Sequence, residues 1–144
     1  MWDLRVGVIG PGDEFDTDQA RVMVTRAFDD IAARYPRKLV TVVAGLANSG
    51  MDQIAYEEAR GRRWDTAGIA CDMLAERDWF PVDEVLDIVP GHWGAERPRF
   101  LRSIHVLIRV GVLYTLPAEA EELEQLKTQG RLVVLDYELP ARSS

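Results

Sequence analysis

The sequence has very little of the chemistry that cross-links small proteins or holds metals. Among its 144 residues there is one cysteine, Cys71, and there are two histidines. A single cysteine excludes an intramolecular disulfide and a multi-cysteine zinc site. His92 and His105 are not spaced as ligands on one helix face, so we expect no metal site, and we expect no other cofactor.

Long apolar runs and an excess of positive charge are also missing. No apolar stretch is long enough to cross a membrane, and the chain opens without the basic start, apolar stretch and cleavage site of a signal peptide. Its 24 acidic and 17 basic residues leave a formal net charge of -7, which repels phosphate backbones. We therefore expect a cytoplasmic protein that partners neither membranes nor nucleic acid. A small phosphorylated ligand is still compatible, because helix N-termini and clustered backbone N–H groups bind anions locally.

What the sequence does contain is a regular alternation of apolar strands and helical patterns. The strand-like runs lack period-two alternation, which is typical of parallel strands buried on both faces. With the length of the chain, this predicts a single domain over residues 1–144 of α/β class, with a Rossmann-like three-layer αβα fold and a mostly parallel sheet. Residues 71–99 contain several prolines and glycines and are expected to form loops around one short strand. The predicted strands are 4–9, 38–44, 64–70, 85–89, 104–110 and 131–137, and the helical patterns span 17–35, 51–59 and 117–128.

Three glycine-bearing loops follow three of the apolar strands. They are Gly10-Pro11-Gly12, residues 45–50 and residues 111–115. In an open parallel sheet the ligand crevice lies outside the carboxyl ends of the strands, so we expect all three loops at one edge. Glycine lets the backbone approach a ribose or a phosphate, although each loop by itself is also typical of a tight turn. The first loop has Phe15 where a dinucleotide fingerprint has its third glycine, which disfavours a standard NAD site.

Residues 42–59, VVAGLANSGMDQIAYEEA, resemble the strand, glycine loop and helix of the SLOG superfamily. That superfamily groups the Smf DNA-processing proteins, the Lonely Guy phosphoribohydrolases and nucleotide-sensing domains of bacterial defence systems. Gly45, Gly50 and Asp52 match its motif. The segments RVGVIGPG and HWGAERPRFLRSIHVLIRVG are also similar to it, so the resemblance covers nearly the whole chain. It implies a Rossmann-like domain that binds a nucleotide-derived small molecule, such as a nucleoside phosphate or an ADP-ribose-type signal.

The third loop departs from the pattern of that superfamily. Where a polyglycine turn is usual, this chain reads VGVLYT, and only Gly111 and Thr115 match. Ala118 stands at the place of the phosphoribohydrolase glutamate, and Glu119 follows it, about 100° further around the helix. This departure favours a sensing or sequestering module over an enzyme. The alternative is a phosphoribohydrolase or N-glycosidase acting on nucleoside 5'-monophosphates, with Glu119 or Asp52 as its catalytic carboxylate.

Polar and aromatic side chains near the loops complete the predicted ligand site. Asn48 or Ser49 would cap the second helix, whose free N–H groups then face the crevice. Trp93 would stack on a base or anchor a loop, and Asp52 would hold ribose hydroxyls or complement the helix dipole. Arg109 would meet a phosphate or pair with a carboxylate. Related folds often pair through helices, so we also expect a homo-oligomer, a dimer or higher. The expected ligand-binding set is Gly10, Gly12, Gly45, Asn48, Ser49, Gly50, Asp52, Trp93, Glu96, Arg109, Gly111 and Thr115.

Overall fold

The computed structural model describes residues 3–11, 14–74, 78–92, 94–112 and 117–139, which form one sheet flanked by helices. None of the helices in this part of the chain is long and apolar enough to cross a membrane. The strands are β1 (Asp3–Ile9), β2 (Leu39–Ala44), β3 (Asp65–Cys71), β4 (Glu84–Val89), β5 (Val106–Val110) and β6 (Val133–Tyr137). The α-helices are α1 (Thr17–Arg34), α2 (Gly50–Gly61), α3 (Arg97–Ser103) and α4 (Pro117–Thr128).

The sheet is parallel throughout its described pairings, and its strand order is β4-β3-β2-β1-β5-β6. Val6 of β1 lies opposite Val42 of β2 on one side and opposite Val106 of β5 on the other. The chain therefore builds outward from β1 in one direction as far as β4, and in the other direction through β5 and β6. This arrangement confirms the predicted Rossmann-like α/β fold. Ligands of such sheets bind at the point where the strand order reverses, here between β1 and β5.

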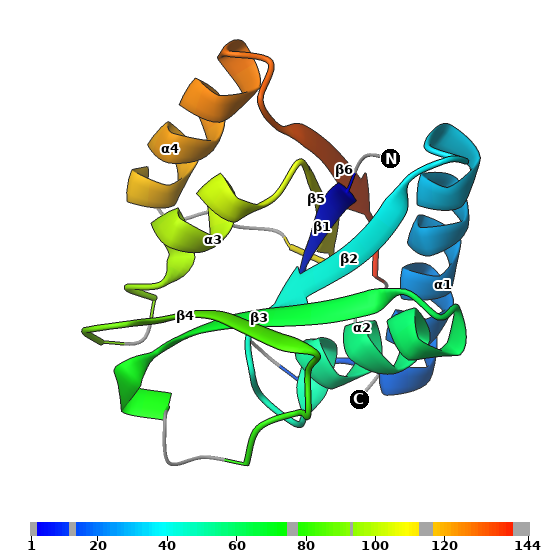
Figure 1. Cartoon of the computed structure of the whole chain (residues 1–144), viewed down its shortest axis with the longest axis horizontal. Helices are drawn as coiled ribbons and strands as arrows, with labels where there is room; N and C mark the ends of the chain where they lie inside the picture. Colours follow the sequence, from blue (N-terminus) through cyan, green and yellow to red (C-terminus); the bar gives the residue numbers. More distant parts are fainter. Residues whose placement is uncertain (1–2, 12–13, 75–77, 93, 113–116, 140–144) are drawn as a thin grey trace.

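Helices cover both faces of the sheet, so the fold has three layers (Figure 1). α1 and α2 pack on one face, and α3 and α4 pack on the other. α1 buries Val24, Phe28 and Ile31, whose spacing places them on a single face of the helix. On the opposite side of the sheet, Phe100 of α3 and Leu123 of α4 belong to a second buried cluster. The apolar periodicity of the sequence thus becomes two cores, one on each face.

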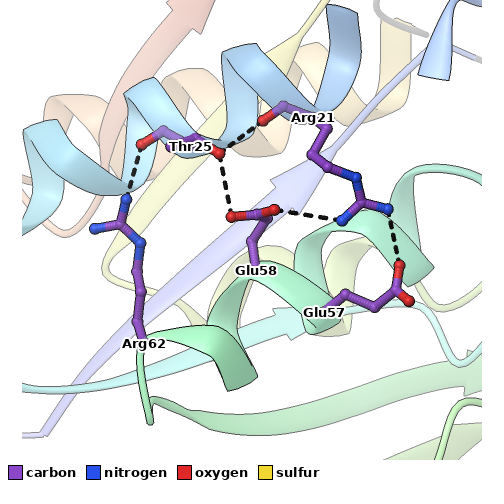
Figure 2. Close-up of polar contacts among 5 residues, drawn as sticks. All are labelled: Arg21, Thr25, Glu57, Glu58 and Arg62. Carbon is purple, nitrogen blue, oxygen red and sulfur yellow. Dashed lines mark hydrogen bonds and ion pairs between the residues drawn. The ribbon is translucent and has the colours of Figure 1, made fainter. Parts of the chain in front are cut away.

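Figure 2 shows the polar contacts that join the outer edges of α1 and α2. Arg21 of α1 forms ion pairs with Glu57 at 2.9 Å and with Glu58 at 3.3 Å, both on α2. The Thr25 hydroxyl lies 3.1 Å from Glu58 Oε2, and Arg62 donates to the Thr25 carbonyl at 3.1 Å. Partly exposed ion pairs such as these contribute about 0–1 kcal/mol each. They orient the two helices more than they stabilise the protein.

One local feature differs from the sequence-based prediction. α3 was not predicted: its residues 97–99 belong to the segment that was expected to be loops, and residues 100–103 were assigned to no element. Pro98 lies in its first turn, where proline breaks no helical hydrogen bond. α1 is capped by Asp16, whose carboxylate accepts the N–H groups of Asp18 at 3.0 Å and Gln19 at 3.1 Å. α1 therefore begins at Thr17, where the predicted helical pattern begins. α4 also begins at 117 and ends at 128 as predicted.

Candidate functional site

The carboxyl ends of β1, β2 and β5 lie side by side at one edge of the sheet. Gly10 follows β1, residues 45–49 lead from β2 into α2, and Gly111 follows β5. Each of the four helices begins at this same edge, because each follows a strand that runs toward it. The topology thus brings Gly10, Gly45 and Gly111, the described starts of the three glycine loops, together with the amino ends of helices from both faces.

At the first two loops, the room beside the glycine is filled by the protein itself. A Cβ on Gly10 would lie 2.7 to 2.8 Å from three side-chain atoms of Met51, in α2. A Cβ on Gly45 would overlap the carboxylate of Asp52, also in α2. Glycine at these two positions therefore allows the loops to pack closely on α2. Close packing on α2, and not the approach of a ligand, thus explains the glycines at these two positions.

The later candidate glycines differ from each other. A Cβ on Gly111 would lie 2.7 Å from the Cβ of Leu139, which follows β6. Gly50 has a φ of +62°, which favours glycine, and no atom lies within 4 Å of the place of its Cβ. Among the candidate glycines that the structure describes, Gly50 is thus the one with open space beside it. Gly12 lies outside the described residues.

Asp52 lies in the first turn of α2 and folds back over the loop that precedes the helix. The backbone N–H groups of Ala47 and Gly45 donate to its carboxylate. Burial of the carboxyl raises its pKa from 3.8 to about 6, even though these two hydrogen bonds and the charge of Arg97 lower it. The group therefore changes its charge close to neutral pH. As an acceptor from its own loop, it also determines how that loop is folded.

Tyr56, one turn further along α2, is a site residue that the sequence analysis missed. Its hydroxyl accepts the N–H of Ala44 at 3.1 Å, and it lies 2.6 Å from the Gly45 carbonyl and 2.8 Å from the Ala67 carbonyl. It thus fixes the carboxyl end of β2 to β3. Burial raises the pKa of this phenol well above its usual value, so it stays protonated. An aromatic residue at a helical core position gives no sequence signal of this bonding.

Four charged side chains meet at this edge, and we call them the edge cluster: Asp52, Glu96, Arg97 and Glu119. Arg97 Nη1 lies 3.7 Å from Glu119 Oε1, and the charges of Arg97 and Glu96 act on the Asp52 carboxyl. Glu96 also accepts the N–H of Gly94 at 3.0 Å. The cluster therefore contains one cation and three carboxyl groups. The described residues contain no group of three or more metal-ligating side chains close enough to hold a metal ion.

Arg97 is the second site residue that the sequence analysis missed. Its side chain is 30% exposed, and its guanidinium lies over the ring of Phe100, 5.9 Å from the centroid. The 3.7 Å contact with Glu119 is longer than a hydrogen bond, and no described residue accepts one from this guanidinium. By contrast, the guanidinium of Arg62 donates to the Thr25 carbonyl. Arg97 therefore keeps its donors available at the switch point of the sheet.

Of three other predicted site residues at the edge, Arg109 and Asn48 already have partners. Arg109 forms two hydrogen bonds with the Asp136 carboxylate, at 2.6 and 2.9 Å, so the carboxylate alternative is the one that the structure contains. Asn48 bonds Asp78 through both its backbone N–H and its side-chain amide, at 3.2 Å each. Ser49 is the N-cap residue of α2 and is exposed, but its side chain makes no capping hydrogen bond. Trp93 and Thr115 lie outside the described residues.

The similarity of this chain to known proteins lies in its fold. No protein-family model matches the chain, and no curated protein does. Its structure is similar to that of the molybdenum cofactor carrier protein of Chlamydomonas reinhardtii, with 23% identity and a TM-score of 0.63 over 96% of this chain and 79% of that one. The molybdenum cofactor binding protein of the phototrophic bacterium Rippkaea orientalis has 22% identity and a TM-score of 0.65 over 94% and 78%. At these identities the similarity establishes a shared fold.

Proposed function

We propose that the protein binds a small molecule at the edge cluster and holds it without chemical conversion, as a carrier or a sensor. The observation that carries this proposal is Arg97, a partly buried guanidinium without a hydrogen-bond acceptor among the described residues. A guanidinium that pairs with a carboxylate only beyond hydrogen-bond distance keeps N–H donors for an anionic ligand at the edge where such sheets bind ligands. The fold neighbours that are named as carriers or binders of the molybdenum cofactor add support.

The ligand class that fits best is a nucleotide-derived molecule with an anionic group. Arginine donates parallel N–H bonds to phosphate, so Arg97 would hold a phosphate, while Glu96 would accept hydrogen bonds from ribose hydroxyls. The match of Gly45, Gly50 and Asp52 to the SLOG motif points to the same class. Nucleoside phosphates and ADP-ribose-type signals are therefore the first candidates. The molybdenum cofactor is a further candidate.

A holding role fits the carboxylates better than a catalytic one. Asp52 already accepts two hydrogen bonds from its own loop, and Glu119 faces the positive charge of Arg97. Neither carboxylate is presented to a ligand without a competing partner. The raised pKa of Asp52, about 6, is the observation that favours the alternative, a hydrolase of nucleoside 5'-monophosphates, since general acids work best with a pKa near the working pH.

One calorimetric and chromatographic experiment tests both functions. The full chain is titrated with ADP-ribose, nucleoside monophosphates and the molybdenum cofactor, and each mixture is analysed for released base after long incubation. We expect saturable binding of one of these ligands, recovered intact. Arg97→Gln should weaken this binding about tenfold or more, and Arg26→Gln, an exposed arginine on α1, should leave it unchanged. Absence of binding by the wild type would overturn the proposal, and release of base that Glu119→Gln abolishes would favour the hydrolase.

The proposal includes a cytoplasmic location and assembly into a homo-oligomer. Cys71 is a buried free thiol, which suits a reducing compartment. Several large apolar side chains are exposed, among them Leu39 at 57% and Val133 at 40%, and a partner subunit would cover such groups. Multi-angle light scattering of the purified chain tests the assembly. A monomer at micromolar concentration would contradict it.

A further inference from the structure

The structure contains a second region of interest at the other end of the sheet, where the strands begin. A cavity of about 390 Å³ lies there between α3 and the amino-terminal parts of β1 to β4, with Thr41, Ala67 and Leu86 along the sheet. The described part of the connection between β3 and β4 contains only a short 3-10 helix, Asp72–Leu74. The described residues of this connection thus bring no α-helix onto the sheet beside α3. We call this space the amino-end cavity.

Three arginines from two elements line the amino-end cavity. Arg5 comes from β1, and Arg99 and Arg102 lie about one turn apart on α3. Their side chains remain 36%, 38% and 51% exposed, in that order. Each is held in place by a hydrogen bond from one of its nitrogens, which leaves other donors of a five-donor group for a ligand. The acceptors are, in the same order, the Ser103 carbonyl, the Asp87 carboxylate at 3.2 Å and the Glu122 carboxylate at 3.3 Å.

A second cavity shows that such an arrangement of arginines is not general in this protein. It measures about 330 Å³, lies between α1 and α2, and contains one arginine, Arg21. That guanidinium is shared between Glu57 and Glu58 (Figure 2). Arg21 therefore lies between two carboxylates, whereas Arg5, Arg99 and Arg102 each pair with one. Asp18 adds a further carboxylate to the lining. The amino-end cavity gathers three guanidinium groups although the whole chain has a net charge of -7.

We propose that the amino-end cavity binds a phosphorylated sugar, at a site independent of the edge cluster. The planar fork of an arginine matches the oxygens of a phosphate, and Arg5, Arg99 and Arg102 offer three such forks around one space. The carboxylates of Asp3 and Glu84 also line the cavity and would accept hydrogen bonds from sugar hydroxyls. The volume lies in the lower part of the range of small-molecule sites, which is about 300–1,000 Å³. A ligand with both a phosphate and hydroxyl groups uses more of this lining than phosphate alone.

An NMR titration of the full chain with ribose 5-phosphate tests this proposal. We expect saturable shifts of the amide signals of Arg5, Arg99 and Arg102, with weaker binding of inorganic phosphate and none of ribose. The double variant Arg99→Gln, Arg102→Gln should weaken the binding about tenfold or more, because two charged donors are lost. Arg26→Gln, exposed on α1, is the matched control and should bind like the wild type.

The location of the site is tested separately. The amide signals of Arg5, Arg99 and Arg102 should follow one saturable curve with ribose 5-phosphate, whether or not signals of the edge cluster also shift. If the shifts are confined to the edge cluster, or if Arg26→Gln weakens the binding as much as the double variant does, the amino-end site is wrong. No saturable shift in the wild type would also overturn the proposal. Should the glutamine double variant fail to fold, Arg99→Lys with Arg102→Lys keeps the charges and removes the forks, and it should still bind more weakly than the wild type.

Discussion

The two ends of the sheet hold their charged groups in different ways. At the carboxyl end, Arg97 lies among carboxyl groups without a hydrogen-bond acceptor in the described chain, and Asp52 is enclosed by its own loop. At the amino end, the guanidinium groups of Arg5 and Arg99 each donate to an acceptor. The backbone N–H of Arg5 also donates to the Nδ1 atom of His105 at 3.0 Å. The hydrogen-bond partners of the charged side chains thus distinguish the two ends, whereas the candidate glycines do not. Close packing against other residues explains most of those glycines.

The two ends also respond to pH in opposite directions. Burial raises the pKa of Asp52 to about 6, so the folded protein holds this proton more tightly than the unfolded chain does. Burial and the charge of Arg5 lower the pKa of His105 below 6.5, so the folded protein disfavours that proton. The contribution of Asp52 to stability is therefore lost as the pH rises, and that of His105 is lost as the pH falls. Variants at each end can separate these two contributions to stability.

The largest expected effect is that of Asp52→Asn on the pH dependence of stability. In the wild type, this carboxyl contributes stability that is complete below pH 3.8 and is lost as the pH rises through about 6. A difference of about two pKa units corresponds to about 3 kcal/mol. Urea unfolding at pH 4 and pH 7 should show that the variant gains about 2 kcal/mol of this relative to the wild type at the higher pH, because part of the effect is already present at pH 4. If the free energy of unfolding depends on pH in the same way in both proteins, the carboxyl is not desolvated.

The next effect is the cost of a methyl group at Gly45, which tests whether Asp52 fills the space beside the loop. Because the new Cβ would overlap the Asp52 carboxylate, we expect Gly45→Ala to lower the free energy of unfolding by about 1–3 kcal/mol. Gly61→Ala is the matched control, since no atom lies within 4 Å of that position in α2, and it should raise stability by up to about 1 kcal/mol. Equal effects of the two substitutions in thermal or urea unfolding would contradict the packing account of this glycine.

The smallest effect is expected from His105→Asn at the amino end. The asparagine side chain can still accept the N–H of Arg5, but it has no proton to gain. Below pH 6.5 the wild type should lose stability that the variant keeps, and at pH 8 the two should be alike. Unfolding measured from pH 5 to pH 8 provides the comparison. A variant that loses stability at every pH would indicate that the imidazole acts through packing alone.

The fold could be predicted from the sequence because its signals are local. Unbroken apolar runs specify parallel strands, and α4 has the predicted bounds because Pro117 and Gly130 mark its two ends. α3 was missed for a local reason as well. The glycines and prolines around it are typical of loops, yet Pro98 lies in the first turn, where a helix tolerates proline.

The candidate site could be predicted only in part. The topological rule placed the three loops at one edge, and it brought Asp52 and Glu119 there with them. The contact of Arg97 with Glu119 joins α3 to α4, and the bonds of the Tyr56 hydroxyl join α2 to β2 and β3. Contacts between elements depend on how the helices lie over the sheet. No spacing within the sequence records them.

The central claim is that a ligand binds at the carboxyl end of the sheet through Arg97. An NMR titration of the wild type with the tightest ligand from the calorimetric panel, repeated with Arg97→Gln, tests it most directly. We predict that the amide signals of residues 45–52, 96–97 and 119 shift together and saturate, and that these shifts are lost in the variant. Shifts confined to the amino end of the sheet, or equal in the two proteins, would contradict the claim.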